Sequence, residues 1–473
     1  GAAAVLALAL ALAGAARGEQ GQLQLSSRQL ASGTAAFERF GLSLDAAGSR
    51  LVVASSGTNP SFLDEAKSVA ITGVLKVLID AGSQFDLEHE FTVPQLDNGK
   101  ELIGFGSEAV LNDQGDVLAT IGAYECGNFK CTALFVYTRS GSTWSNVPAK
   151  AEFDDLISRR FTFGTRTRTL AISPSGDSIL VSGLSQSDAD SKPTIKLLSR
   201  SGGSLTTRRT FVGAVGTATF ENLNDVAVGD RHIFLTNSNQ DQTQVTFADY
   251  QDLNNVAVET SQLEGNQAVK FSGVREGRLA IAVASNDGVR LLVVASSDGS
   301  IVASGTFEET FSIGCIAFRG DIFAVGFVET FWGTTEFGRV YHLSGPNLLP
   351  DSYIPAGDFV AGSNGGSISY LQGCAVLGQE VILTSPQADV GELSDAGRSF
   401  AFSFVATPSP TKVPTASPVP PTGRPTQGPT KRSTLSTAPT NAPSKSPTPQ
   451  SDASRGMAAA FTLLAATFAA VLF

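Results

Sequence analysis

The chain has 473 residues, of which 42% are hydrophobic and 16% are charged, and its formal net charge is −11 at pH 7. An acidic balance of this size argues against a nucleic-acid-binding protein, which needs a basic surface. The 4 cysteines are few but even in number, which permits two disulfides and fits an extracellular protein.

The N-terminus resembles a secretory signal peptide. Residues 1–16, GAAAVLALALALAGAA, are apolar and rich in small side chains, and polar residues follow from Glu19 to Gln24. The alternative is a buried or membrane-spanning helix, which the short length and the polar sequence after it disfavour. We therefore expect a partial signal peptide over 1–16 and a secreted protein.

Residues 22–406 alternate short Val, Ile, Leu and Phe runs with turns rich in Gly, Ser, Asp and Asn, which predicts an all-β domain. One unit of strand, tight turn, apolar strand, loop and third strand recurs seven times. The clearest copies are Phe40–Gly57, Phe105–Ala123 and Phe163–Gly183, and weaker copies begin at Phe220, Phe271, Phe311 and Ser367. The repeat has room for a fourth strand, so we predict a seven-bladed β-propeller of four-stranded antiparallel blades.

The seventh unit supplies three strands and then enters a Pro-rich tract, so its fourth strand must come from elsewhere. Residues 22–30, QLQLSSRQL, alternate Leu23 and Leu25 with polar residues. We predict that this N-terminal strand fills the open edge and closes the ring.

The three clearest copies begin with Phe-Gly, as FGLSLD, FGSEAV and FGTRTR, and Phe135–Ser145 reads FVYTRSGSTWS. In this strand context the pattern resembles FG-GAP repeats, the blades of integrin-alpha-like propellers and related surface proteins. The resemblance implies a β-propeller and, more loosely, adhesion or extracellular ligand binding.

Integrin-type FG-GAP blades carry calcium loops, but the equivalent turns here are poor in carboxylates. They are Asp45–Arg50, Asn112–Val117 and Ser173–Ser178, each with one or two acids. Hard cations need several oxygen ligands, so we expect ordinary turns, with no metal site and no cofactor.

No catalytic residue is predicted. Neighbouring acids such as Asp154 and Asp155 should point to opposite faces of a strand, and the 3 histidines lie singly. A surface hydrolase acting on glycans is the alternative, and it would need two acids and an arginine facing the channel. The sequence does not place such a cluster.

The cysteines are expected to be structural. Cys126 and Cys131 bracket the loop CGNFKC and should form a local disulfide. Cys315 and Cys374 occupy matching positions in the first strands of units six and seven, where they are either bonded or two buried thiols.

The loops between the second and third strand of each unit emerge on one face of a propeller. They are acidic, and one of them carries Phe331 and Trp332. This face should attract cationic partners, unless its acidity serves only solubility. The predicted partner-binding residues are Asp188, Asp190, Glu329, Phe331, Trp332, Glu336 and Asp389.

The C-terminal part is rich in Pro, Thr and Ser over 407–450, which predicts a disordered stalk with O-linked glycans. Residues 451–473 read as a GPI-attachment signal or a transmembrane anchor. We thus expect an extracellular, cell-surface propeller that binds an extracellular protein or cationic ligand and contacts the membrane only through this anchor. A structural wall or coat role is a further alternative.

Overall fold

The computed structural model describes residues 24–32, 41–55, 73–82, 84–97, 99–159, 168–186, 192–216, 218–238, 242–250, 258–264, 268–285, 288–307, 312–328, 336–355, 373–385 and 398–405. All of them belong to the first of two compact units, Gly1–Ala406 and Thr407–Phe473. The predicted signal peptide, stalk and C-terminal anchor lie outside the described residues. Among the residues described, no helix is both long and apolar enough to cross a membrane.

Every named element is a β-strand, which confirms the all-β prediction. The strands form antiparallel groups of four, each running from a first strand outward. Group 1 is β2 (Ser43–Ala47), β3 (Arg50–Ser55), β4 (Val74–Asp80) and β5 (Phe85–Phe91). Group 2 is β6 (Ile103–Leu111), β7 (Val117–Cys126), β8 (Phe129–Ser140) and β10 (Ala149–Ile157), with β9 (Thr143–Trp144) paired to β8. Group 3 is β11 (Leu170–Ile172), β12 (Ser178–Ser185), β13 (Pro193–Ser201) and β14 (Ser204–Val212).

The same order continues along the chain. After the short pair β15 (Ala214–Val215) and β16 (Ala218–Thr219), group 4 is β17 (Leu223–Val228), β18 (His232–Ser238), β19 (Gln242–Asp249) and β20 (Val258–Glu264). Group 5 is β21 (Ala268–Phe271), β22 (Arg278–Ser285), β23 (Gly288–Ala295) and β24 (Ile301–Phe307). Group 6 is β25 (Ser312–Arg319), β26 (Ile322–Val328), β27 (Glu336–Ser344) and β28 (Asn347–Pro355).

The strands from Gln24 to Val405 are here called the head, and its last group combines strands from both ends. Its order is β29 (Gly373–Leu377), β30 (Glu380–Ser385), β31 (Arg398–Val405) and β1 (Gln24–Ser32). Strand β1 runs antiparallel to β31, from Gln24 opposite Val405 to Ser32 opposite Arg398. The N-terminal segment therefore lies at the outer edge of the sheet that contains the last strand of the head.

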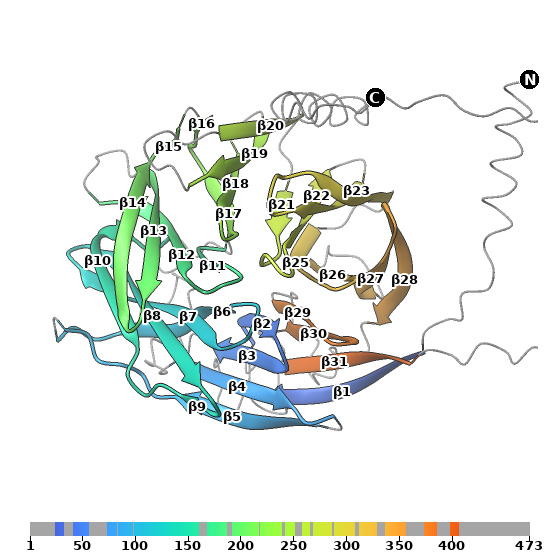
Figure 1. Cartoon of the computed structure of the whole chain (residues 1–473), viewed down its shortest axis with the longest axis horizontal. Helices are drawn as coiled ribbons and strands as arrows, with labels where there is room; N and C mark the ends of the chain where they lie inside the picture. The colour runs from blue at the N-terminus through green and yellow to red at the C-terminus, as the bar shows by residue number, and fades with distance from the viewer. Residues whose placement is uncertain are drawn as a thin grey trace, which may run out of the picture. The chain divides into compact units, whose positions relative to one another are not determined.

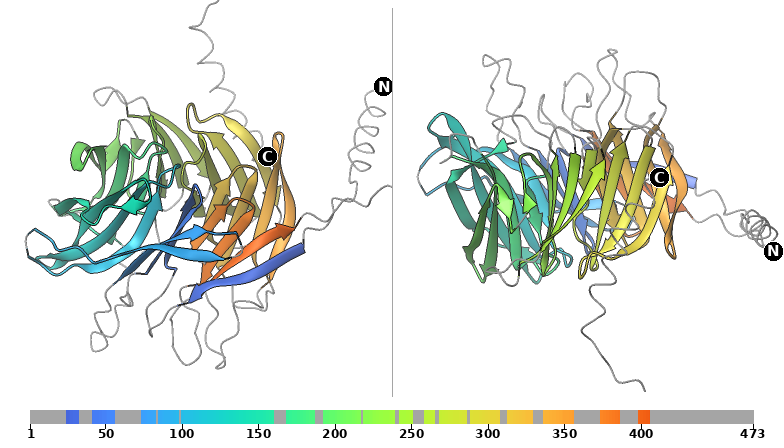
Figure 2. Two further views of the ribbon diagram at one scale, coloured as in Figure 1. Left: turned by 60° about the horizontal axis from the view of Figure 1, so that its bottom comes forward. Right: turned by 90° about the horizontal axis from the view of Figure 1, so that it is seen from above.

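The first strands of the groups lie around a common centre (Figure 1). Each contacts the next in chain order, from β2 to β6, β11, β17, β21, β25 and β29, and β29 in turn contacts β2. Figure 2 shows the strands of successive groups standing side by side. This radial arrangement of antiparallel sheets is that of a β-propeller.

Glycine at the first turns lets neighbouring groups approach closely. Gly48, between β2 and β3, has φ 59°, a conformation that disfavours other residues. A Cβ atom built at Gly48 would lie 2.9 Å from the carbonyl oxygen of Gln114, in the corresponding turn of group 2. The Gly that marks the turn in the sequence thus also packs one group against the next.

Apolar side chains fill the space between adjacent sheets. One core cluster joins Leu44 and Leu51 of group 1 to Ala375, Ile382 and Ala401 of the last group. Residues far apart in the sequence therefore share one core, and burial of these side chains stabilises the first group against the last.

A polar network joins groups 1 and 2. The Glu88 carboxylate on β5 accepts hydrogen bonds from Arg50 Nε at 2.8 Å, Arg139 Nε at 3.1 Å and Trp144 Nε1 at 3.0 Å. Burial by itself raises the pKa of Glu88, but the hydrogen bonds from Arg50 and Trp144 and the two positive charges bring it below its ordinary value. The Arg and Trp of the segment FVYTRSGSTWS therefore hold a carboxylate of the preceding group.

Candidate functional site

Most of the predicted partner-binding residues lie outside the described part of the chain, namely Asp188, Asp190, Glu329, Phe331, Trp332 and Asp389. Glu336 is the first residue of β27, where it is paired with Pro355. On the face predicted from the loops between second and third strands, the structure describes the connection of the β7–β8 hairpin without a gap. We take this hairpin and the charged residues around it as the candidate site.

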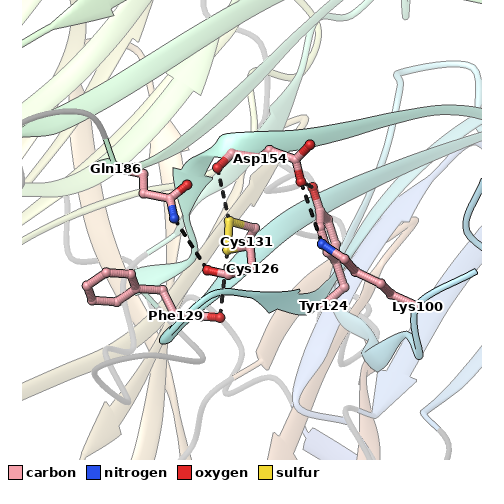
Figure 3. Close-up of a disulfide and its surroundings, with 7 residues drawn as sticks. All are labelled: Lys100, Tyr124, Cys126, Phe129, Cys131, Asp154 and Gln186. Atoms are coloured by element: carbon pink, nitrogen blue, oxygen red, sulfur yellow. Dashed lines mark hydrogen bonds and ion pairs between the residues drawn. A yellow bond between two sulfur atoms is a disulfide. The ribbon is translucent and has the colours of Figure 1, made fainter. Parts of the chain in front are cut away.

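The β7–β8 hairpin has a two-residue turn. Cys126 pairs with Phe129, and Gly127 takes a positive φ of 69°, as a glycine at the first central position of a tight hairpin turn can. Cys126 and Cys131 form a disulfide with their Cα atoms 5.7 Å apart (Figure 3). The predicted local disulfide is confirmed.

Neighbouring elements hold the tip of this hairpin in place. Gln186 Nε2 donates a hydrogen bond to the Cys126 carbonyl at 3.3 Å, and the Ser158 amide donates one to the Lys130 carbonyl at 2.8 Å. The Cys131 sulfur lies 3.3 Å from the Asp154 carbonyl oxygen (Figure 3). Phe129 is 37% exposed at this fixed tip, so an aromatic side chain is available for contact without the entropy loss of ordering a loop.

Ion pairs around the hairpin share one feature: the carboxylate is more exposed than the amine. The side chain of Lys196 is 8% exposed and that of its partner Asp155 is 61% exposed. The other pairs of this kind are Lys150–Asp97, Lys130–Glu125 and Lys100–Asp154. Although each pair is neutral, its carboxylate is more exposed than its amine, so an approaching molecule meets more negative than positive charge.

Asp154 and Asp155 turn toward different partners, as expected for adjacent residues of a strand. Tyr124 Oη donates a hydrogen bond to Asp154 Oδ1 at 3.0 Å, and Lys100 Nζ lies 5.1 Å from the centre of the Tyr124 ring (Figure 3). Asp155 instead pairs with Lys196 of group 3. Burial, the hydrogen bond to Asp154 and nearby acids raise the pKa of Tyr124, so the phenol keeps its proton and remains a donor.

Carboxylates in the turns between first and second strands contact other groups of the protein. Asn112 Oδ1 accepts hydrogen bonds from the amides of Asp116 and Val117, and Asn112 Nδ2 donates to Asp116 Oδ1. Asp177 pairs with Arg200 at 3.3 Å. Among the described residues, no group of three or more His, Cys, Asp or Glu side chains is placed to hold a metal ion.

The structure also brings together three residues that the sequence did not connect: Asp45, Asp113 and Arg275, here called the channel cluster. Arg275 lies 2.5 Å from Asp45 and 3.7 Å from Asp113. Burial lowers the pKa of Arg275, but the charge and hydrogen bond of Asp45 and the charge of Asp113 raise it by more. Burial also raises the pKa of Asp113, and Arg275 opposes that rise.

The channel cluster has the composition that a glycan hydrolase would need, but its groups bind one another. The adjoining depression is lined by residues such as Arg168, Val110 and Ala171 and has room for about one water molecule. The cluster therefore acts as a tie between the first turns of groups 1, 2 and 5.

No protein-family model matches the chain. No curated protein matches it either. Solved structures similar to it include one of two prolyl endopeptidases (14% identity, 75% of this chain and 46% of that chain, TM-score 0.44). A second is the WD40 domain of Toxoplasma gondii coronin, with 10% identity over 82% of this chain and 88% of that chain and a TM-score of 0.44. A third is the β-propeller domain of the trilobed protease of Pyrococcus furiosus, with 10% identity over 60% of this chain and 77% of that chain and a TM-score of 0.36. Because these scores are low, the propeller assignment rests on the strand pairing and contacts described above.

Proposed function

We propose that residues 22–406 are a seven-bladed propeller of the FG-GAP kind, displayed at the cell surface on the C-terminal stalk and anchor, that binds a cationic extracellular protein without catalysis. The cyclic contacts of the first strands and the β1–β31 pairing support seven blades closed by the N-terminal strand. Two disulfides support an oxidising, extracellular setting.

One observation carries the binding role: around the β7–β8 hairpin, the carboxylate of each ion pair is more exposed than its amine. Outward carboxylates steer a basic partner during encounter. Phe129, on the fixed turn, supplies an apolar contact once the partner has arrived.

The test uses the full secreted chain and a fluorescent oligolysine peptide, with binding followed by anisotropy at low and high salt. The variant D97N/E125Q/D155N removes three outward carboxylates. At roughly 0.5 kcal/mol per exposed charge, it should bind oligolysine about tenfold more weakly.

The matched control D86N/D177N/D298N removes three exposed carboxylates elsewhere on the protein: Asp86 is the second residue of β5, and Asp177 and Asp298 lie in the turns before β12 and β24. It should keep near wild-type affinity. Equal losses in both triple variants would show that net charge alone governs binding and would refute a site at the hairpin. No binding of oligolysine by the wild type would favour the wall or coat role.

A surface glycan hydrolase is the second candidate because Asp45, Asp113 and Arg275 meet at the centre of the head. Asp113, whose pKa burial raises, would be the proton donor. Turnover of chromogenic glycosides that is abolished in D113N would support it, whereas equal rates in D113N and wild type would refute it.

A further inference from the structure

A basic segment stands out in this acidic chain. Residues 191–220 contain five basic residues and no acid. Two of the five are paired, Lys196 with Asp155 at 2.8 Å and Arg200 with Asp177 at 3.3 Å. Arg208 and Arg209, on β14, are exposed and form no ion pair with any residue that the structure describes. Positive charge is therefore available on this strand.

A β-bulge brings the two arginines to one side of the strand. Leu197 pairs with Arg209 and Leu198 pairs with Thr207, so Arg208 is the extra residue. In a regular strand, consecutive side chains point to opposite faces, and a bulge re-aims one of them.

The ring contacts of the two arginines agree with this reorientation. The Arg208 guanidinium lies 5.9 Å from the centre of the Tyr250 ring, and that of Arg209 lies 5.9 Å from the centre of the Phe211 ring. Both rings belong to the same core cluster, which packs groups 3 and 4 together. The two guanidinium groups therefore flank one seam of the head.

Placement over the rings prepares these arginines for an anion. A guanidinium whose planar face meets an aromatic ring keeps its N–H edge free, and that edge matches two oxygens of an oxyanion. Part of the ordering entropy of each long side chain is already lost in the free protein, which favours binding. Strand β14 is the outermost strand of group 3, so a large ligand can reach it (Figure 1).

We propose that Arg208 and Arg209 bind the sulfate groups of a sulfated polysaccharide. This surface is distinct from the acidic hairpin site and selects a ligand of opposite charge. A nucleic acid fits less well because it carries one negative charge per roughly 1.7 Å of duplex, which would extend past the short basic strand onto an acidic protein. A polysaccharide with sparser sulfates can place one or two of them here.

The test measures binding of the full chain to immobilised heparin, to chemically desulfated heparin and to a single-stranded DNA oligonucleotide. R208Q/R209Q removes the charge-assisted contacts to sulfate and should weaken heparin binding by roughly tenfold or more. R208K/R209K keeps the charge but loses the planar two-oxygen contact, so its affinity should fall between those of the wild type and the glutamine variant.

The matched control is K76Q/R231Q, which removes two positive charges from side chains already paired with Glu90 and Asp249. It should bind heparin within about twofold of wild type, since paired surface charges contribute little. The proposal is overturned if the control and R208Q/R209Q lose affinity equally, or if desulfated heparin binds as well as heparin. Tighter binding of DNA through the same two arginines would also overturn it, in favour of a nucleic-acid site.

Discussion

Replacing Glu88 by alanine should destabilise the head strongly. The substitution would leave Arg50 and Arg139 charged, although their side chains are only 11% and 17% exposed, and would leave the Trp144 indole without its acceptor. Removing one partner of a buried ion pair typically costs about 3–5 kcal/mol, because the opposite charge stays buried. We expect a loss of that size in the free energy of unfolding.

Urea unfolding of the full chain, followed by tryptophan fluorescence, measures this loss. Trp144 is 2% exposed and should report the separation of groups 1 and 2. The control is E90Q, whose carboxylate is 53% exposed and lies 3.5 Å from Lys76, and it should change stability by less than about 0.5 kcal/mol.

The pH dependence provides a second readout for Glu88. The pKa of Glu88 is lower in the folded protein than its ordinary value of 4.5. Its contribution to the unfolding free energy is therefore complete above pH 4.5 and is lost as the pH falls through the folded-state pKa. The stability gap between wild type and E88A should therefore shrink in acid. If E88A and E90Q are equally stable at neutral pH, the network is only a surface contact and the reasoning fails.

Three further changes should be measurable by thermal or urea unfolding. The disulfide between Cys315 and Cys374 closes a sequence separation of 59 residues, so its removal should lower the unfolding free energy by about 4 kcal/mol through chain entropy. Removal of the hairpin disulfide, with its separation of 5, should lower it by about 2 kcal/mol, and equal losses would contradict this reasoning. The hydrogen bond and charge of Asp351 raise the pKa of His342. The contribution of His342 to the unfolding free energy should therefore be complete below pH 6.5 and be lost as the pH rises through the folded-state pKa. A stability difference between H342Q and wild type that grows with pH would refute this. R275Q should cost about 3–5 kcal/mol of unfolding free energy at neutral pH. The loss should be smaller in acid, because burial raises the pKa of Asp113 and this carboxyl becomes protonated there; a loss independent of pH would count against the channel cluster.

The periodic features of the sequence predicted the larger part of this fold. Alternating apolar runs and glycine turns predicted the strands. The matching positions of Cys315 and Cys374 predicted either a disulfide or two buried thiols, and the structure has the disulfide, with the Cα atoms 5.6 Å apart. These features succeed because each depends on local pattern or on the repeat itself.

Contacts across the centre of the head could not be predicted in the same way. Arg275 is 230 residues from Asp45, and its position depends on the turn that holds Glu276 at φ 51° and on how the groups close around the centre. The bulge at Arg208 is a matter of register between two strands, which composition does not encode. Most of the predicted binding loops lie outside the described residues, so that prediction stays open.

The position of β31 has a mechanical consequence for the C-terminal tether that we propose. Tension on the chain after Val405 pulls first on β31, which lies between β30 and β1 and is bonded along both edges. Two rows of hydrogen bonds would then share the load along the strand direction, so the head should withstand traction better than it would with a last strand held on one side only.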